Sequence, residues 1–181
     1  MTLASLLARD RAALCERWAE SADAAYPFAA AGLLRTQRNA FANPVGTRTR
    51  EAASLLLTAI LDENMDEDAL RPGLEEFIRV RAVQDMTAEQ AVAPVFAFKA
   101  VIRRQLAAQK TAMTDETRTE LTALEDRIDA LALLSFGLYA RCRDDLHEMQ
   151  LKDVKRRHSQ LLRYMQRHGL AAEDDAEAGP Q

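Results

Sequence analysis

The feature that most constrains this chain is a long stretch near its C-terminal end that lacks strong helix breakers. Between Thr114 and Gly169 no proline occurs, and the only glycine is Gly137. Thr114 is followed by Asp115 and Glu116, an arrangement typical of the start of a helix. The sequence therefore predicts a single helix of about fifty residues, roughly 75 Å long at 1.5 Å per residue.

This predicted helix carries two apolar stripes that are out of phase with each other. At spacings of three and four residues, the first stripe comprises Leu121, Leu124, Ile128, Leu131, Ser135, Leu138 and Cys142. The same spacing would continue onto the charged residues Asp145 and Lys152. A second stripe instead comprises Leu151, Val154, His158, Leu161, Met165 and His168. We expect the first stripe to pack in a helical core, and the second to face something outside that core.

The rest of the chain also has the composition of helices. Hydrophobic residues make up 48% of the sequence, but only 6% is aromatic, and the runs of β-branched residues typical of strands are missing. Further helices are predicted over Leu3–Ala25, over 31–41, from Pro44 with Asn43 as its cap, from Pro72, and from Thr87 with Gln90 completing a capping box. The fold class is therefore predicted to be all-α. We expect a globin-like or helix-bundle domain of about six helices with a long C-terminal helix that protrudes from the body.

The charge pattern supports a division of the chain into three segments. Residues 152–168 carry six Lys or Arg and one Asp, whereas residues 169–181 carry four acidic residues and no basic one. We expect a helical domain over 3–150, a protruding helix over 151–169 and a disordered acidic tail over 170–181. No aromatic residue interleaves the basic run 152–158 and the net charge of the chain is −4, so we expect no nucleic-acid partner.

Motifs that carry common catalytic chemistry do not occur in the sequence. The six glycines are never within four positions of one another, so neither a GxGxxG turn nor a phosphate-binding P-loop can form. The patterns GxSxG and CxxC are missing as well. These absences argue against nucleotide-fold enzymes and α/β-hydrolases. We predict that the protein is not an enzyme and has no catalytic residues.

Residues able to hold a metal or haem are few. His147, His158 and His168 are the only histidines, and all lie in the predicted last helix. Asp144 and His147 stand three positions apart, but a di-iron site in a helix bundle needs two Glu-x-x-His pairs and two further glutamates. We therefore expect no metal site, no haem and no other cofactor.

Three features bear on the compartment. Arg9–Arg11 interrupt the apolar run that a signal peptide would need, and the longest apolar stretch, Ala130–Ala140, is about half as long as a membrane span. Cys15 and Cys142 stand alone in helical patterns, which is typical of reduced, packed thiols. We predict a cytoplasmic protein that does not insert into membranes.

The second stripe is the main candidate for a binding surface. Its residues fit the a and d positions of two and a half heptads, which is short for a coiled coil. Lys155 and Arg157 flank it without acidic complements, so self-pairing would be weak. Two interpretations stay open: the stripe folds back onto its own domain, or it contacts a partner protein, a second copy included. The predicted interface residues are Leu151, Val154, His158, Leu161 and Met165.

Several segments together resemble a known family. They are Phe-Ala-Asn-Pro-Val-Gly at 41–46, Arg-Val-Arg-Ala-Val-Gln-Asp at 79–85, Leu-Glu-Asp-Arg-Ile-Asp-Ala-Leu-Ala-Leu at 124–133 and Val-Lys-Arg-Arg at 154–157. In this order they resemble the RsbRD N-terminal domain family of RsbT co-antagonists in bacterial stress signalling, over about residues 3–158. The resemblance implies a helical sensory or scaffolding module, which in relatives precedes a STAS domain in the stressosome. Here we expect a stand-alone copy without the STAS domain.

These observations lead to a functional hypothesis and its alternatives. We predict a non-catalytic protein-interaction or sensory module of bacterial signalling. The alternatives are a sensor that binds a small molecule or cofactor, and an accessory protein of an anaerobic respiratory complex. The partners are expected to be proteins, with a homodimer through the C-terminal helix as one candidate.

Overall fold

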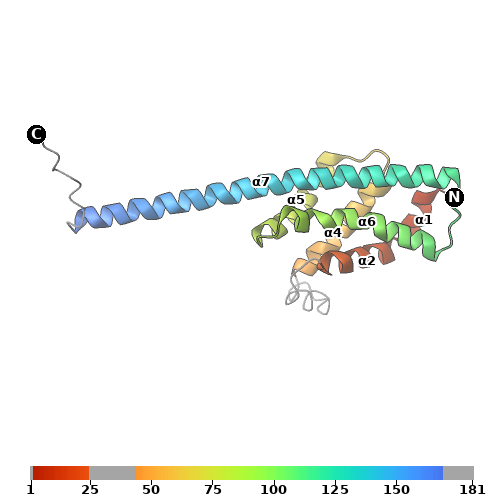
Figure 1. Ribbon diagram of the computed structural model, residues 1–181, viewed down its shortest axis with the longest axis horizontal. Coiled ribbons are helices and arrows are strands. Elements are labelled where there is room, and N and C mark those ends of the chain that lie inside the picture. Colours follow the sequence, from red (N-terminus) through yellow and green to blue (C-terminus); the bar gives the residue numbers. More distant parts are fainter. Residues whose placement is uncertain (1, 25–43, 169–181) are drawn as a thin grey trace, which may run out of the picture. The chain divides into compact units, whose positions relative to one another are not determined.

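A computed structural model describes residues 2–24 and 44–168, and within these ranges every regular element is a helix (Figure 1). The all-α fold class is thus confirmed for the described part of the chain. The helices are α1 (Leu3–Arg9), α2 (Arg11–Ala24), α4 (Pro44–Leu61), α5 (Glu67–Val83), α6 (Ala88–Ala108) and α7 (Asp115–Arg167).

The long C-terminal helix predicted from the lack of breakers is present as α7, which has 53 residues. The side chain of Thr114 accepts a hydrogen bond from the N–H of Thr117 at 3.2 Å and so caps its first turn. The chain divides into two compact units, residues 1–143 and residues 144–181. The predicted segment boundaries at 150 and 169 stay predictions.

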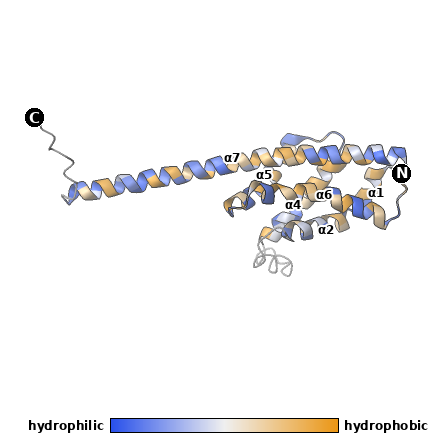
Figure 2. Cartoon of the chain, viewed as in Figure 1, coloured by the Kyte–Doolittle hydropathy of each residue, from blue (hydrophilic) through white to orange (hydrophobic). Residues whose placement is uncertain are grey.

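The first unit is organised around one apolar core. Buried side chains from α1, α2, α4, α5, α6 and the first part of α7 form a single cluster. Figure 2 shows apolar residues concentrated along these helices. The first stripe of α7 contributes to the core as predicted, because Leu124, Ile128, Leu131, Ser135, Leu138 and Cys142 are all buried.

Aromatic side chains fill the middle of this core. The ring of Trp18 stacks on Phe98 with 4.9 Å between centroids and lies 5.5 Å from Phe77. Its indole N–H donates to the carbonyl oxygen of Pro94 at 2.6 Å, which satisfies the polar atom of this buried residue. The guanidinium of Arg81, also buried, lies 3.6 Å from the centroid of the Phe77 ring. These side chains occupy the space between α2, α5 and α6.

The prediction of one helix over Leu3–Ala25 was wrong, because the chain breaks at Asp10. The N–H of Asp10 donates to the carbonyl of Leu7 and closes α1. Its carboxylate accepts from Gln105 at 2.6 Å and also from Gln109, both of which belong to the C-terminal end of α6. The joint between α1 and α2 is therefore held by partners nearly a hundred residues away.

The prediction that Pro72 opens a helix was also wrong. Helix α5 begins at Glu67, since the carboxylate of Asp66 accepts from the N–H groups of Asp68 and Ala69. Pro72 lies within the helix that this cap starts.

Other predicted helix starts agree with the structure or lie beyond its description. Pro44 is the first residue of α4, and Thr87 and Gln90 form the predicted capping box of α6. The predicted cap Asn43 and the predicted helix over 31–41 lie outside the described residues.

Candidate functional site

The second stripe of α7 faces solvent within the second unit. Leu151, Val154 and Leu161 keep 46%, 63% and 56% of their surface exposed, and His158 is exposed as well. Met165 is half-buried. Apolar side chains exposed at this spacing are typical of a surface that contacts another helix.

Two further residues widen this surface toward its C-terminal end, and the sequence interpretation missed both. Leu162 is 46% exposed and Tyr164 is 55% exposed. The Tyr164 ring lies 4.3 Å from the ring of His168, one helical turn further on. In the heptad frame these two residues occupy the e and g positions beside Leu161 and Met165. Their positions next to the second stripe could have identified them from the sequence, because e and g positions flank the seam between two helices.

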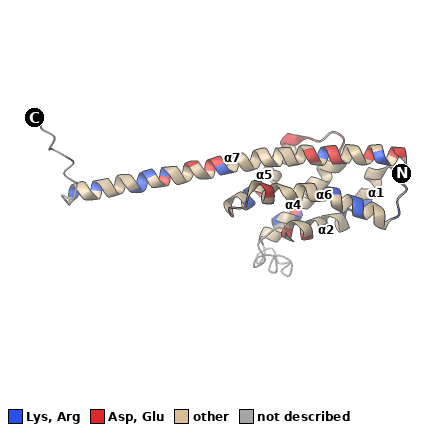
Figure 3. Ribbon diagram, in the orientation of Figure 1, with Lys and Arg blue, Asp and Glu red and all other residues tan. Residues whose placement is uncertain are grey.

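Charged residues beside the stripe are paired along the helix itself. Figure 3 shows acidic residues mixed with basic ones where this part of α7 begins, and basic residues toward its C-terminal end. Lys152 lies 2.9 Å from Glu148, and Asp153 lies 2.7 Å from Arg156 and 2.8 Å from Arg157. The side-chain hydrogen bond and the positive charge of Lys152 lower the pKa of Glu148 below its ordinary value. These pairs partly neutralise the basic run and leave the apolar stripe between them.

The residues considered as metal ligands are spread along the exposed helix. Asp144 and His147 are both exposed. In the ranges that the structure describes, no three His, Cys, Asp or Glu side chains gather as the ligands of a metal ion would. None of the helices in those ranges is both long and apolar enough to cross a bilayer.

The two cysteines occupy packed positions in the first unit. Cys142 is buried in the core stripe of α7, and Cys15 on α2 is half-buried. Burial raises the pKa of the Cys15 thiol. This effect is larger than the lowering of the pKa by the positive charge of Arg11, and the negative charge of Glu16 raises the pKa further. A raised pKa keeps a thiol protonated and weakly nucleophilic, so Cys15 has the character of a packing residue.

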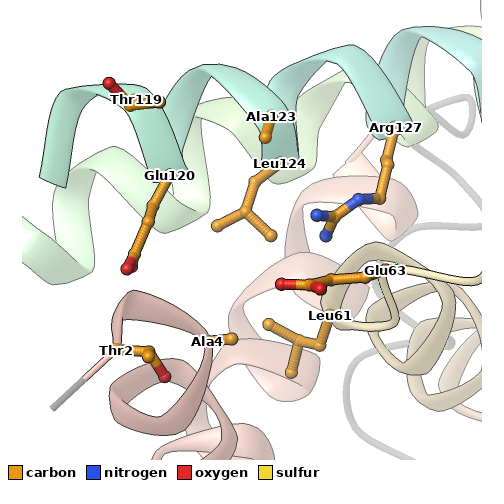
Figure 4. A pocket seen from close by; sticks show the side chains of 9 residues that line it. All are labelled: Thr2, Ala4, Leu61, Glu63, Thr119, Glu120, Ala123, Leu124 and Arg127. Carbon is orange, nitrogen blue, oxygen red and sulfur yellow. The ribbon is translucent and has the colours of Figure 1, made fainter. Parts of the chain in front are cut away.

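A pocket with mixed polarity lies where α1, the end of α4 and α7 meet in the first unit (Figure 4). It has a volume of about 230 Å³ and is lined by Thr2, Ala4, Leu61, Glu63, Thr119, Glu120, Ala123, Leu124 and Arg127. The sequence interpretation did not find it, because its walls come from three segments separated by about sixty residues each. No local motif marks such a meeting point.

Two charged residues of the pocket also fasten the ends of other helices to α7. The carboxylate of Glu120 accepts from the backbone N–H of Leu3 at 2.5 Å, within the first turn of α1. The guanidinium of Arg127 donates to the carbonyl oxygen of Ile60 at 2.5 Å, in the last turn of α4. Both contacts satisfy backbone groups that a helix end leaves without an intrahelical partner. They also hold the two charged side chains in fixed positions at the pocket.

The model of a known protein family matches most of the chain. The family model described as the RsbT co-antagonist protein rsbRD N-terminal domain matches residues 12–154. No curated protein and no solved structure matches the chain. The matched range covers α2, α4, α5, α6 and most of α7.

Proposed function

The chain belongs to the RsbRD N-terminal domain family, and from this premise we propose that it is a non-catalytic interaction module of bacterial signalling. The family consists of signalling domains of the stressosome type. The observation that carries the proposal is the exposure of Leu151, Val154 and Leu161 on one side of α7. These residues form the contact surface, and the contact is made in the cytoplasm.

The occupant of this surface is a second copy of the chain, paired in parallel. Full burial of a leucine or valine side chain contributes about 1.5–3 kcal/mol, so pairing these residues offers a driving force that the single helix lacks. In a parallel pair, g positions meet e positions of the partner five residues further on. Gln150 would then meet Lys155, and Arg157 would meet Leu162, so no like charges face each other across the seam.

The pairing is expected to be modest in strength. His158 occupies a central a position, where an apolar residue would pack better, and the seam comprises only two and a half heptads. Such a short contact suits a switchable association better than a permanent one.

A pair of matched variants of the full chain tests the proposal. Val154→Glu with Leu161→Glu places two charges in the seam, whereas Ser159→Glu with Gln160→Glu places two charges on the opposite side of the same turn. By size exclusion with light scattering at tens of micromolar, we expect the parent and the second variant to be dimers and the first to be a monomer. The proposal fails if the parent is monomeric under these conditions. It fails equally if the seam variant stays as dimeric as the parent.

A further inference from the structure

The pocket formed by α1, the end of α4 and α7 has features of a ligand site. We propose that it binds a small zwitterion with a short apolar body, which is the chemistry of a free aliphatic amino acid. This inference concerns the signal that the domain senses, and it goes beyond the proposed interaction through the second stripe of α7. It stands entirely on residues of the first unit.

The size of the pocket limits the ligand to a small metabolite. A volume of about 230 Å³ lies below the 300–1,000 Å³ of sites for drug-sized molecules. A small molecule of the size of an aliphatic amino acid matches this space.

The middle of the pocket is apolar and firmly held. Leu124 is buried and belongs to the core, and Leu61 packs against the core beside it. Ala4 and Ala123 complete the apolar lining. Figure 4 shows Leu124 lying between Glu120 and Arg127, and Leu61 lying next to Glu63. This lining favours an aliphatic side chain and disfavours a second charged group in the middle of the ligand.

The charged groups of the pocket are not paired with one another. Within the described residues, Arg127 forms no ion pair with a carboxylate, and Glu63 forms neither a hydrogen bond nor an ion pair. Other carboxylates of α7 do form ion pairs. Glu125 lies 2.7 Å from Arg103, and Asp129 lies 2.7 Å from Lys99. The pocket thus presents a cation and an anion that both have bonding capacity left.

The arrangement of these charges matches an α-amino acid. Arg127 and Glu63 lie at the same end of the pocket, as Figure 4 shows. A guanidinium binds a carboxylate in a fixed planar geometry, and a carboxylate accepts from an ammonium group. The adjacent carboxylate and ammonium of an amino acid would therefore contact Arg127 and Glu63, with its side chain lying over Leu124. The contact of Arg127 with Ile60 fixes the guanidinium for this role.

Calorimetry on the full chain tests the ligand class with charge-deleted analogues. Alanine, valine, leucine and methionine serve as zwitterions, 3-methylbutylamine lacks the carboxylate, and 4-methylpentanoate lacks the ammonium group. We expect saturable binding of at least one of the amino acids and binding at least about tenfold weaker for both analogues, because each loses a charge-assisted hydrogen bond. The inference is overturned if no amino acid binds saturably, or if either analogue binds as tightly as the best amino acid.

Two variants test whether the amino acid binds in this pocket. Glu63→Gln removes a charge from an exposed residue without a hydrogen bond among the described residues, so it should weaken amino-acid binding at least about tenfold with an unchanged melting temperature. Asp126→Asn removes a charge from an exposed neighbour of Arg127 that does not line the pocket, and should leave the affinity unchanged. Equal affinities of Glu63→Gln and the parent would overturn the inference. Light scattering of Glu63→Gln separates this outcome from a failure of the proposed dimer, which the substitution should not affect.

Discussion

The two apolar stripes of α7 have the same spacing but different surroundings. Ile128 and Leu131 in the first stripe are fully buried, whereas Val154 and Leu161 in the second keep more than half of their surface exposed. Apolar residues at three- and four-residue intervals define one face of a helix in both regions. What differs is the set of helices available to cover that face. The pattern therefore predicts a surface that needs a partner and does not say which chain supplies it.

The largest expected effect is on the free energy of unfolding. A substitution in the core should lower it much more than the same substitution at a solvent-facing position two residues away. Leu131 is 0% exposed and Leu133 is 73% exposed on the same helix. Leu131→Ala should lower the free energy of unfolding by about 2–5 kcal/mol, because it removes buried methyl groups and leaves a cavity. Leu133→Ala should change it by less than about 0.5 kcal/mol. Urea denaturation followed by circular dichroism measures both, and similar losses for the two variants would contradict the assignment of the core face.

A smaller effect of opposite sign is expected at Gly137, where an added Cβ would meet no atom within 4 Å. Alanine has a higher helix propensity than glycine, so Gly137→Ala should raise the free energy of unfolding by roughly 0.5–1 kcal/mol. Gly73 in α5 serves as the contrast, because a Cβ there would come within 2.7 Å of a methyl carbon of Leu55.

Gly73→Ala gains the same propensity but forces Leu55 to move. We therefore expect a smaller gain than at Gly137, or a loss, in the same urea denaturation experiment. If Gly73→Ala stabilised the protein more than Gly137→Ala, the assignment of open space to Gly137 and of close contact to Gly73 would be wrong.

The smallest expected effect concerns the exposed charges beside the second stripe. The pKa of Glu148 is lowered by its hydrogen bond to Lys152 and by the charge of that residue. A lowered pKa in the folded state means that the pair stabilises the helix at neutral pH and that this contribution is lost as the pH falls below the ordinary glutamate range. The effect on helix content should be slight, since exposed pairs on one helix are weak.

An NMR titration of the Glu148 carboxyl measures this directly. Lys152→Ala should raise the pKa of Glu148 toward the ordinary glutamate value, whereas Lys155→Ala, which removes a nearby charge outside the pair, should leave it nearly unchanged. If Glu148 titrates at the same pH in the parent and in Lys152→Ala, the pair does not persist in solution.

Local patterns in the sequence predicted those parts of the fold that depend on neighbouring residues. The length of α7, its core stripe and the capping box of Thr87 with Gln90 all follow from contacts within a few positions. The break at Asp10 could not be predicted in this way, because its partners Gln105 and Gln109 lie on another helix. At α5, the sequence pattern favours Pro72 as the helix start, but the helix begins at the Asp66 cap six residues before it.

The candidate sites were predictable to different degrees for the same reason. The stripe with Leu151 and Val154 is periodic along a single helix, so its residues could be named from the sequence, while its partner could not. The pocket brings together Glu63, Glu120 and Arg127 only after α4 and α7 have packed. None of these three residues has a neighbour in the sequence that marks it as part of a site.

The position of Trp18 gives the first unit an optical reporter of its own. Trp18 is the single tryptophan of the chain, is fully buried, and donates its indole N–H to Pro94 within the aromatic cluster. Its fluorescence should therefore be blue-shifted in the native protein and shift to the red only when the core around α2 and α6 opens. Residues 144–181 contain no tryptophan, so their unfolding does not change the tryptophan fluorescence and is detected only by circular dichroism. The difference between the two unfolding curves isolates the behaviour of the solvent-facing end of α7.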